Sequence, residues 1–250
     1  MSVKIAVTGA TGRVGEHVVD VLREQGIETV EIARSLGVDL VSGEGLDEAL
    51  EGVTCIIDCA TGNSPDGAEA AAFFEAATRN LAAAGARAGV TRAVVVSIIG
   101  IDQFDSGYNG AKKVHERAWL ESGLDVRVLR AAQFHEFVET MLMWSRQGDV
   151  ASLPPMRTQL VAARAVAESL VDLALNDEVE GGPIWEIAGP REERLAEVAK
   201  LIAPEGVQVQ EGGGLGDADV SLYEAGALLP CPDARLAGPT FEEWLAKATA

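Results

Sequence analysis

The sequence has few of the residues that stabilise secreted or metal-binding proteins. Its 250 residues include three cysteines and three histidines. Three cysteines make a poor disulfide framework, and Cys55 and Cys59 share one strand-like run whose straight backbone would keep them too far apart to bridge. No cluster of cysteine and histidine has metal-site spacing. We therefore expect no metal and a reducing, cytoplasmic location.

Basic residues and long apolar runs are also lacking. The chain has 20 basic and 39 acidic residues, a formal net charge of −19. Such a charge repels nucleic acid and anionic membrane surfaces, so neither is an expected partner. No run of 18 apolar residues could span a membrane. The start, one lysine followed by a strand-like run, does not resemble a signal peptide. A small-molecule substrate and a monomer or homodimer remain as expectations.

Strand-like runs alternate with helical patterns along the first half of the chain. This alternation, with nearly continuous apolar strands, predicts an α/β fold with a Rossmann-type, doubly wound parallel sheet. The expected strands are Val3–Thr8, Glu28–Ala33, Val38–Leu40, Val53–Cys59, Ala93–Ser97 and Val126–Arg130, and the expected helices are Val14–Gln25, Leu46–Leu50, Ala68–Ala88 and Ala111–Ser122.

The alternation loosens after Arg130. Residues 1–130 are predicted to form the nucleotide-binding body, and residues 131–250 a smaller C-terminal lobe on the substrate side, within one compact unit. The segment Glu205–Asp233 contains no lysine or arginine and is predicted to be loop-rich. The other expected elements are helices Glu136–Arg146, Ala163–Leu175, Glu192–Ile202 and Phe241–Ala248 and a strand at Ile184–Ile187.

Three glycines interrupt the first apolar run, in the sequence V-K-I-A-V-T-G-A-T-G-R-V-G. Gly9 would permit a tight turn, Gly12 would let the backbone approach a pyrophosphate, and Gly15 would let helix and strand pack closely. The helix that follows presents N–H groups and a partial positive charge to phosphates. A strand–glycine–helix context predicts dinucleotide binding, whereas the alternative is a plain strand-to-helix turn.

The end of the second strand predicts which dinucleotide is bound. Ala33 stands where NAD-binding sheets carry an acid for the ribose 2′-hydroxyl, and Arg34 follows it. A guanidinium suits a 2′-phosphate, and Arg13 could reach the same group, which favours NADP over NAD. Alternatively, Arg34 is a solvated loop residue and Glu31 binds a ribose. The full set of expected cofactor-binding residues is Gly9, Thr11, Gly12, Arg13, Val14, Gly15, Arg34, Ser35, Asp39, Ala60 and Lys112.

Two further positions near strand ends have more than one interpretation. Asp39 either accepts from the adenine amino group or caps the next turn. Ala60 follows the strand Val53–Cys59, whose carboxyl end is expected beside the nicotinamide ribose because ligands bind outside the carboxyl ends of such strands.

A second group of residues predicts catalysis. Tyr108 and Lys112 form a Y-x-x-x-K pair on one helix face, and Ser97 ends the preceding strand. An adjacent ammonium would lower the pKa of the tyrosine and make it a usable acid or base, while Ser97 would orient a carbonyl. The alternative is a surface tyrosine with a solvated lysine. Lys113 and His115 are interpreted as exposed helix residues.

These motifs, with Leu129–Phe137 (L-R-A-A-Q-F-H-E-F), resemble the short-chain dehydrogenase/reductase superfamily, and more narrowly its atypical NmrA-like NAD(P)H-binding branch. The resemblance covers about residues 1–202. It implies a Rossmann fold, a nicotinamide dinucleotide, Tyr108 as acid/base and Lys112 bonded to the nicotinamide ribose. It does not imply a substrate.

The chain also departs from that family pattern. Phe74 falls where many active members have an asparagine that completes a proton relay, and the interval Ile98–Gly107 is short. The main hypothesis is an NADP-dependent oxidoreductase that acts on a small carbonyl or alcohol. A redox sensor that binds dinucleotide without turnover is the second. An epimerase or dehydratase that retains NAD is a third, disfavoured because position 33 carries no acid.

Three residues that follow the sixth strand are expected near the nicotinamide and the substrate, namely Gln133, Phe134 and His135. His135 is interpreted as a hydrogen-bonded structural residue in preference to a second acid. Phe134, Phe137, Met141, Met143 and Trp144 would line an apolar pocket or form the core of the small lobe.

Overall fold

The computed structural model describes residues 3–62, 64, 66–177, 181–212 and 219–248. These residues form two compact units. The first contains residues 1–97, 104–130 and 166–185, and the second contains residues 98–103, 131–165 and 186–250. The chain therefore leaves the first unit twice, briefly at residues 98–103 and again at residues 131–165, and returns to it for residues 166–185.

A seven-stranded sheet has the order β12-β9-β5-β4-β3-β1-β2. Parallel pairing joins β1 to β2, β1 to β3, β3 to β4 and β12 to β9, which confirms the predicted Rossmann-type parallel sheet. The strands are β1 (Lys4–Thr8), β2 (Glu28–Ile32), β3 (Cys55–Asp58), β4 (Arg92–Ile98), β5 (Asp125–Ala131), β9 (Ile184–Ala188) and β12 (Arg235–Leu236).

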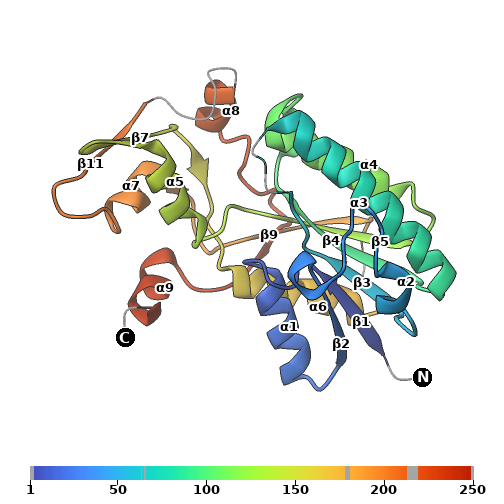
Figure 1. Cartoon of the computed structure of the whole chain (residues 1–250). Coiled ribbons are helices and arrows are strands. Elements are labelled where there is room, and N and C mark those ends of the chain that lie inside the picture. Colours follow the sequence, from blue (N-terminus) through green and yellow to red (C-terminus); the bar gives the residue numbers. More distant parts are fainter. Residues whose placement is uncertain (1–2, 63, 65, 178–180, 213–218, 249–250) are drawn as a thin grey trace. The chain divides into compact units, whose positions relative to one another are not determined.

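Helices cover both faces of this sheet (Figure 1). Helices α3 and α4 pack side by side on one face, and α1 and α6 lie on the other. Asp66 begins α3 by accepting the N–H groups of Ala68 and Glu69, and Gly89 ends it in the left-handed region at φ +81°. The helices are α1 (Gly15–Glu24), α2 (Leu46–Ala49), α3 (Gly67–Ala88), α4 (Gly107–Leu120) and α6 (Ala163–Leu175).

The core of the first unit lies between these layers. Strand β3 is buried along its whole length, as expected for a strand covered on both faces. Leu81, Ile56 and Trp119 are among its fully buried side chains. All three cysteines are free thiols, and burial raises the pKa of Cys55 to about 12. None of the helices in the described ranges is long and apolar enough to cross a membrane.

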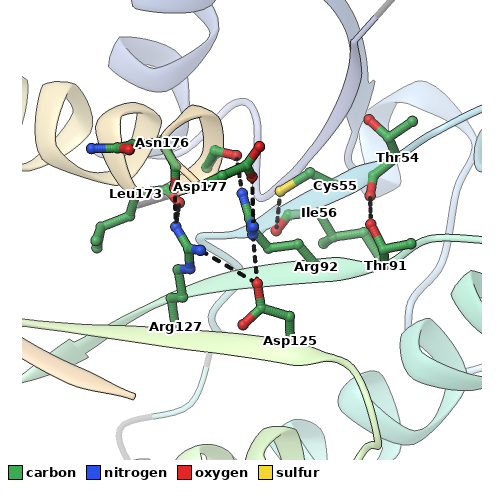
Figure 2. A network of polar contacts seen from close by, with 11 residues as sticks. Thr54, Cys55, Ile56, Thr91, Arg92, Asp125, Arg127, Leu173, Asn176 and Asp177 are labelled. Carbon is green, nitrogen blue, oxygen red and sulfur yellow. Dashed lines mark hydrogen bonds and ion pairs between the residues drawn. The ribbon is translucent and has the colours of Figure 1, made fainter. Parts of the chain in front are cut away.

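Two arginines at the amino ends of β4 and β5 hold the C-terminal end of α6 (Figure 2). The Arg127 guanidinium donates to the carbonyl oxygens of Leu173, at 2.7 Å, and Asn176. Arg92 donates to the carbonyl oxygen of Ala174 at 3.0 Å. The last carbonyls of a helix have no partner within the helix, so these cations satisfy them and complement the negative end of the helix dipole.

Arg127→Leu is expected to lower the free energy of unfolding by about 2–4 kcal/mol, because buried carbonyls of α6 would lose their charged donor. Urea unfolding followed by circular dichroism measures this change. Arg79→Leu, which alters an exposed arginine on α3, is the matched control and should change stability by less than about 0.5 kcal/mol. Equal midpoints for the two variants would contradict the capping role.

The second unit combines small sheets with short helices. Strands β6, β7 and β11 form one sheet, and β8 pairs antiparallel with β10. The elements are α5 (Phe137–Ser145), β6 (Arg146–Gln147), β7 (Val150–Leu153), β8 (Arg157–Thr158), β10 (Glu193–Arg194), α7 (Leu195–Lys200), β11 (Gln208–Glu211), α8 (Val220–Ala225) and α9 (Phe241–Ala248).

Several predicted elements differ from the structure. Val38–Leu40 is not a strand, because the Asp39 carboxylate accepts the N–H groups of Val41 and Ser42 and closes a turn. Helix α4 begins at Gly107 and not at Ala111, and the helix predicted over 192–202 is divided into β10 and α7. The predicted loop 205–233 contains β11 and α8; residues 213–218 within it lie outside the described part.

Candidate cofactor and catalytic site

The glycine loop after β1 folds so tightly that two of its glycines have no room for a side chain. Gly9 has φ +62°, and a Cβ added to it would lie 2.7 Å from the Cys59 carbonyl oxygen. A Cβ on Gly15 would lie 2.1 Å from the Gly9 carbonyl oxygen. The protein's own packing therefore requires glycine at both positions.

Gly12 differs from the other two glycines. It is exposed, its N–H donates to Gly9 O at 2.9 Å, and a Cβ on it would lie 3.1 Å from that same oxygen. Thr11 and Arg13 flank it at the exposed tip, while Val14 is buried. This exposed tip, here called the cradle, leads directly into the N-terminus of α1, where a phosphate can be bound.

Strand register brings the other predicted residues to the same edge of the sheet. Thr8 pairs with Ile32 on β2 and with Asp58 on β3, and Asp58 pairs with Val95 on β4. The segments that follow these four strands therefore emerge together at the carboxyl ends, where parallel α/β sheets bind ligands. They contain the glycine loop, Arg34 and Ala60, and Ser97 is the second-to-last residue of β4.

The end of β2 places Arg34 at this edge, with Asp39 near enough to interact with its charge. Arg34 is exposed at the start of a short 3-10 helix (Arg34–Leu36), beside exposed Ser35. The Glu31 carboxylate is ion-paired with Arg23 of α1 at 3.3 Å. Asp39 caps its turn, and these backbone N–H donors hold its pKa below the usual range.

Tyr108 lies in the first turn of α4 and is bonded to a residue of the loop after β3. Its hydroxyl is 2.8 Å from the Thr61 hydroxyl. Burial raises the pKa of Tyr108, although the bond to Thr61 opposes the rise. Ser97 is buried at the end of β4, and its hydroxyl has no hydrogen-bond partner among the described residues. A buried hydroxyl without a partner fits a group that orients a substrate oxygen.

Lys112 is buried one helical turn after Tyr108. Its ammonium donates to the Val96 carbonyl oxygen at 2.9 Å, lies 3.0 Å from His115 Nδ1 and stands 4.7 Å from the centre of the Phe74 ring. Burial lowers the pKa of Lys112 to about 8. The predicted lowering of the Tyr108 pKa by this ammonium is wrong, because burial of the phenol dominates and its own partner, Thr61, is uncharged.

The expectation that His115 is exposed is also wrong. Its side chain is 2% exposed and lies 3.0 Å from the Asp58 carboxylate. Trp119 donates to the same carboxylate oxygen at 2.8 Å, and Thr8 donates to the other. Lys113, in contrast, is partly exposed and bonds to Phe104 O and Asp105.

Thr61, Asp58 and His115 are therefore site residues that sequence reasoning did not assign. One signal was available in the chain: His115 follows Lys112 by three residues, so both lie on one helix face. The partnership of Thr61 with Tyr108 joins residues 47 positions apart, and no local pattern encodes it.

The predicted substrate residues Gln133, Phe134 and His135 lie in the second unit. Gln133 accepts from the Thr158 hydroxyl at 2.5 Å, and Phe134 forms a bridge with Val161. His135 is buried, with Nε2 3.1 Å from the Pro239 carbonyl oxygen, in agreement with a structural role.

The apolar residues expected around them do not form one buried group. Met141 is buried, whereas Met143 is 61% and Trp144 63% exposed. Trp144 contacts Phe137 edge to face. Among the described residues, no group of three or more histidine, cysteine or acidic side chains could hold a metal ion.

With this geometry in place, comparison with known proteins identifies the family. The sequence profile described as NAD(P)H-binding matches residues 9–177, which is more than half of the chain. The chain belongs to the NAD(P)H-binding family. No curated protein matches this sequence.

Solved structures resemble this NAD(P)H-binding protein over nearly its whole length. MoeE5 in complex with UDP-glucose and NAD is 17% identical, with a TM-score of 0.70, covering 99% of this chain and 100% of that one. The NAD-dependent NDP-hexosamine 5,6-dehydratase TunA is 15% identical, with a TM-score of 0.70 and 98% coverage of both. A short-chain dehydrogenase/reductase superfamily protein from Agrobacterium tumefaciens with bound NAD is 18% identical, with a TM-score of 0.67, covering 98% and 95%.

These similarities confirm the predicted short-chain dehydrogenase/reductase fold. At 15–18% identity they establish the fold alone. The narrower resemblance to the NmrA-like branch, the preference for NADP and the catalytic roles stay predictions.

Proposed function

We propose that this protein is an NAD(P)-dependent oxidoreductase that acts on a small carbonyl or alcohol. The observation that carries the proposal is the gathering of the glycine loop, buried Ser97 and Tyr108 around the carboxyl ends of four adjacent parallel strands. The cradle at Gly12 and the unpartnered Ser97 hydroxyl fit a dinucleotide and a substrate oxygen, respectively.

In this proposal each side chain has a defined task. The nicotinamide supplies or accepts a hydride when bound. Ser97 orients the substrate oxygen through its hydroxyl. Tyr108 holds the proton that this oxygen receives, because its raised pKa keeps the phenol protonated at neutral pH. Lys112 holds the ribose with its positive charge.

We further propose that the cofactor is NADP. Arg34 and Arg13 supply cations at the exposed edge where the adenosine ribose would lie, and Glu31 is ion-paired with Arg23. A planar guanidinium binds a phosphate with forked, charge-assisted bonds. Two of the solved structures named above contain NAD, so the proposed preference for NADP differs from what those two proteins bind.

Arg34→Ala is expected to weaken NADPH binding about 10- to 100-fold, since a charge-assisted hydrogen bond contributes about 1.5–3 kcal/mol. NADH binding should change little, because NADH lacks the 2′-phosphate. Isothermal titration calorimetry with both dinucleotides measures the two affinities. Arg79→Ala is the control and should affect neither. A wild-type protein that binds NADH as tightly as NADPH would contradict the assignment.

The proposed activity is tested by assaying the wild-type protein with NADPH against small ketones, aldehydes and quinones. Consumption of NADPH that depends on substrate supports the oxidoreductase. Binding of NADPH with no turnover across the panel would favour a dinucleotide sensor. Mass spectrometry of the purified protein completes the test, because tightly retained NAD would favour an epimerase or dehydratase.

We propose that Gln133, Phe134 and His135 contact the substrate, and that the protein acts in the cytoplasm as a monomer or homodimer. Gln133→Ala should raise KM for the substrate found in that assay and leave the dissociation constant for NADPH unchanged. Equal KM values for the variant and the wild-type protein would remove Gln133 from the site.

A further inference from the structure

A series of buried polar side chains connects Lys112 to Asp58 through His115. Lys112 Nζ lies 3.0 Å from His115 Nδ1, and His115 Nε2 lies 3.0 Å from Asp58 Oδ2. All three residues are 4% exposed or less. These contacts connect helix α4, which carries Lys112 and His115, to Asp58, the last residue of β3.

The Lys112 ammonium and the Asp58 carboxylate together determine which nitrogen of the His115 imidazole carries the proton. An ammonium can only donate, and a carboxylate can only accept. Nδ1 of a neutral His115 must therefore accept from Lys112, and Nε2–H must donate to Asp58. The pKa of His115 is lowered, chiefly by burial and then by the Lys112 charge, which agrees with a neutral ring. The ammonium and the carboxylate are thus joined by one neutral imidazole.

Several hydrogen-bond donors surround the Asp58 carboxylate and favour its ionised form. Besides His115, it accepts from the Thr8 hydroxyl, from Ala60 N–H at 3.0 Å and from the Trp119 indole at 2.8 Å. The His115 bond, followed by the Thr8 and Ala60 donors, holds the pKa of Asp58 below the usual range despite burial. A buried carboxylate with this many donors persists as an anion and so provides a fixed negative charge.

Among the charged groups near Lys112, Asp58 raises its pKa the most. Glu116 on α4 also raises the pKa of Lys112, but less than Asp58 does, and it is paired with Arg130 at 2.7 Å. The Cys59 thiol on β3 is neutral because burial raises its pKa. Tyr108 is neutral for the same reason. From α3, Phe74 presents a ring that stacks on His115 with centroids 4.3 Å apart. The ring holds the imidazole in the plane that both bonds need.

We propose that Asp58 and His115 are positioning residues for Lys112, and that the buried carboxylate, acting through a neutral imidazole, keeps the lysine charged and aimed toward the cofactor edge. Their role in turnover rests on the proposed function, but their effect on Lys112 does not. His115, which lies on the same helix as Lys112, is thus the polar side chain bonded to the lysine. Phe74 stands where many members of the family have an asparagine, and its ring offers no hydrogen-bonding group.

Lysine titration measured by NMR tests this inference directly. The sequence has five lysines, so a protein labelled with ¹³C at lysine Cε gives a simple spectrum, and Lys112→Arg assigns the signal. In the wild-type protein the signal should titrate near pH 8, in line with its pKa of about 8. In Asp58→Asn the midpoint should fall by about one pH unit, because the opposite charge is removed.

A second variant and two controls separate positioning from plain stabilisation. His115→Phe keeps an aromatic ring against Phe74 but removes both nitrogens, and it should also lower the Lys112 midpoint. Thr8→Val and Trp119→Phe each remove one donor to Asp58 and leave its charge and the Lys112–His115 bond in place. They should lower the melting temperature without moving the Lys112 midpoint.

The outcomes are distinct. A Lys112 midpoint that falls in Asp58→Asn or His115→Phe, but not in the controls, supports the inference. A midpoint that stays at the wild-type value in both variants overturns it, and should Asp58→Asn fail to fold, His115→Phe alone decides. Calorimetry with NADPH tests the proposed function independently of the lysine titration. If the wild-type protein bound no dinucleotide, the proposed function would be wrong, but the titration would still test whether Asp58 and His115 act on Lys112.

Discussion

Tyr108→Phe is expected to lower kcat by about 10²- to 10⁴-fold, the usual contribution of a positioned acid or base. The substitution keeps the ring and its edge-to-face contact with Phe74 and removes only the hydroxyl. NADPH affinity, measured by calorimetry, should therefore stay close to that of the wild-type protein. Steady-state kinetics with the substrate found in the panel measures the loss.

The chain offers a matched control for this variant. Tyr223, the other tyrosine in the sequence, is buried in α8 of the second unit. Tyr223→Phe removes an equivalent hydroxyl and should leave kcat within about twofold, as expected for a group outside the reaction. Ser97→Ala should lower kcat without weakening NADPH binding. If Tyr108→Phe turned over substrate at the wild-type rate, the proposed proton donor would be wrong whatever the fold.

The pH dependence of turnover follows from two pKa directions. Tyr108 has a raised pKa, so it keeps its proton throughout the neutral range and can supply it to a carbonyl. Lys112, with a pKa of about 8, loses its charge as the pH rises through that value. Carbonyl reduction by the wild-type protein should accordingly decline above pH 8 because of Lys112, before Tyr108 titrates.

Gly15→Ala is expected to disrupt the cofactor loop more severely than any other single methyl addition there. The new Cβ would lie 2.1 Å from Gly9 O and 3.0 Å from Ala10 Cα, so the backbone of the loop or of α1 must move. Overpacking of this kind costs about 1–3 kcal/mol or more. The melting temperature and the NADPH affinity should both fall, the latter by at least about 10-fold.

Two other glycines make this prediction specific. Gly12→Val places methyl groups on the exposed tip, with the new Cβ 3.1 Å from Gly9 O, so the variant should lose less stability than Gly15→Ala and should lose dinucleotide binding. Gly182→Ala is the control, because nothing lies within 4 Å of its added Cβ. Unchanged NADPH affinity in both Gly12→Val and Gly15→Ala would rule out the glycine loop as the cofactor site.

The sequence by itself determined the features that depend on neighbouring residues. Apolar runs marked β1, β3, β4 and β5, and the glycine spacing marked the turn into α1. Helices α6 and α9 have the predicted bounds, Ala163–Leu175 and Phe241–Ala248. In each case the burial of one or both faces of an element requires apolar residues at regular intervals, and this spacing can be read from neighbouring residues alone.

Only the tertiary structure decided the features that depend on distant residues. The two-residue strands β8 and β10 exist because they pair with each other, and Asp39 turns the chain at 38–40 because backbone N–H groups reach its carboxylate. His115 looked like a surface residue until α4 was placed beside Asp58, 57 positions away. Burial and partners set the charge state of Lys112 and Tyr108, and both are properties of the folded packing that residue spacing does not encode.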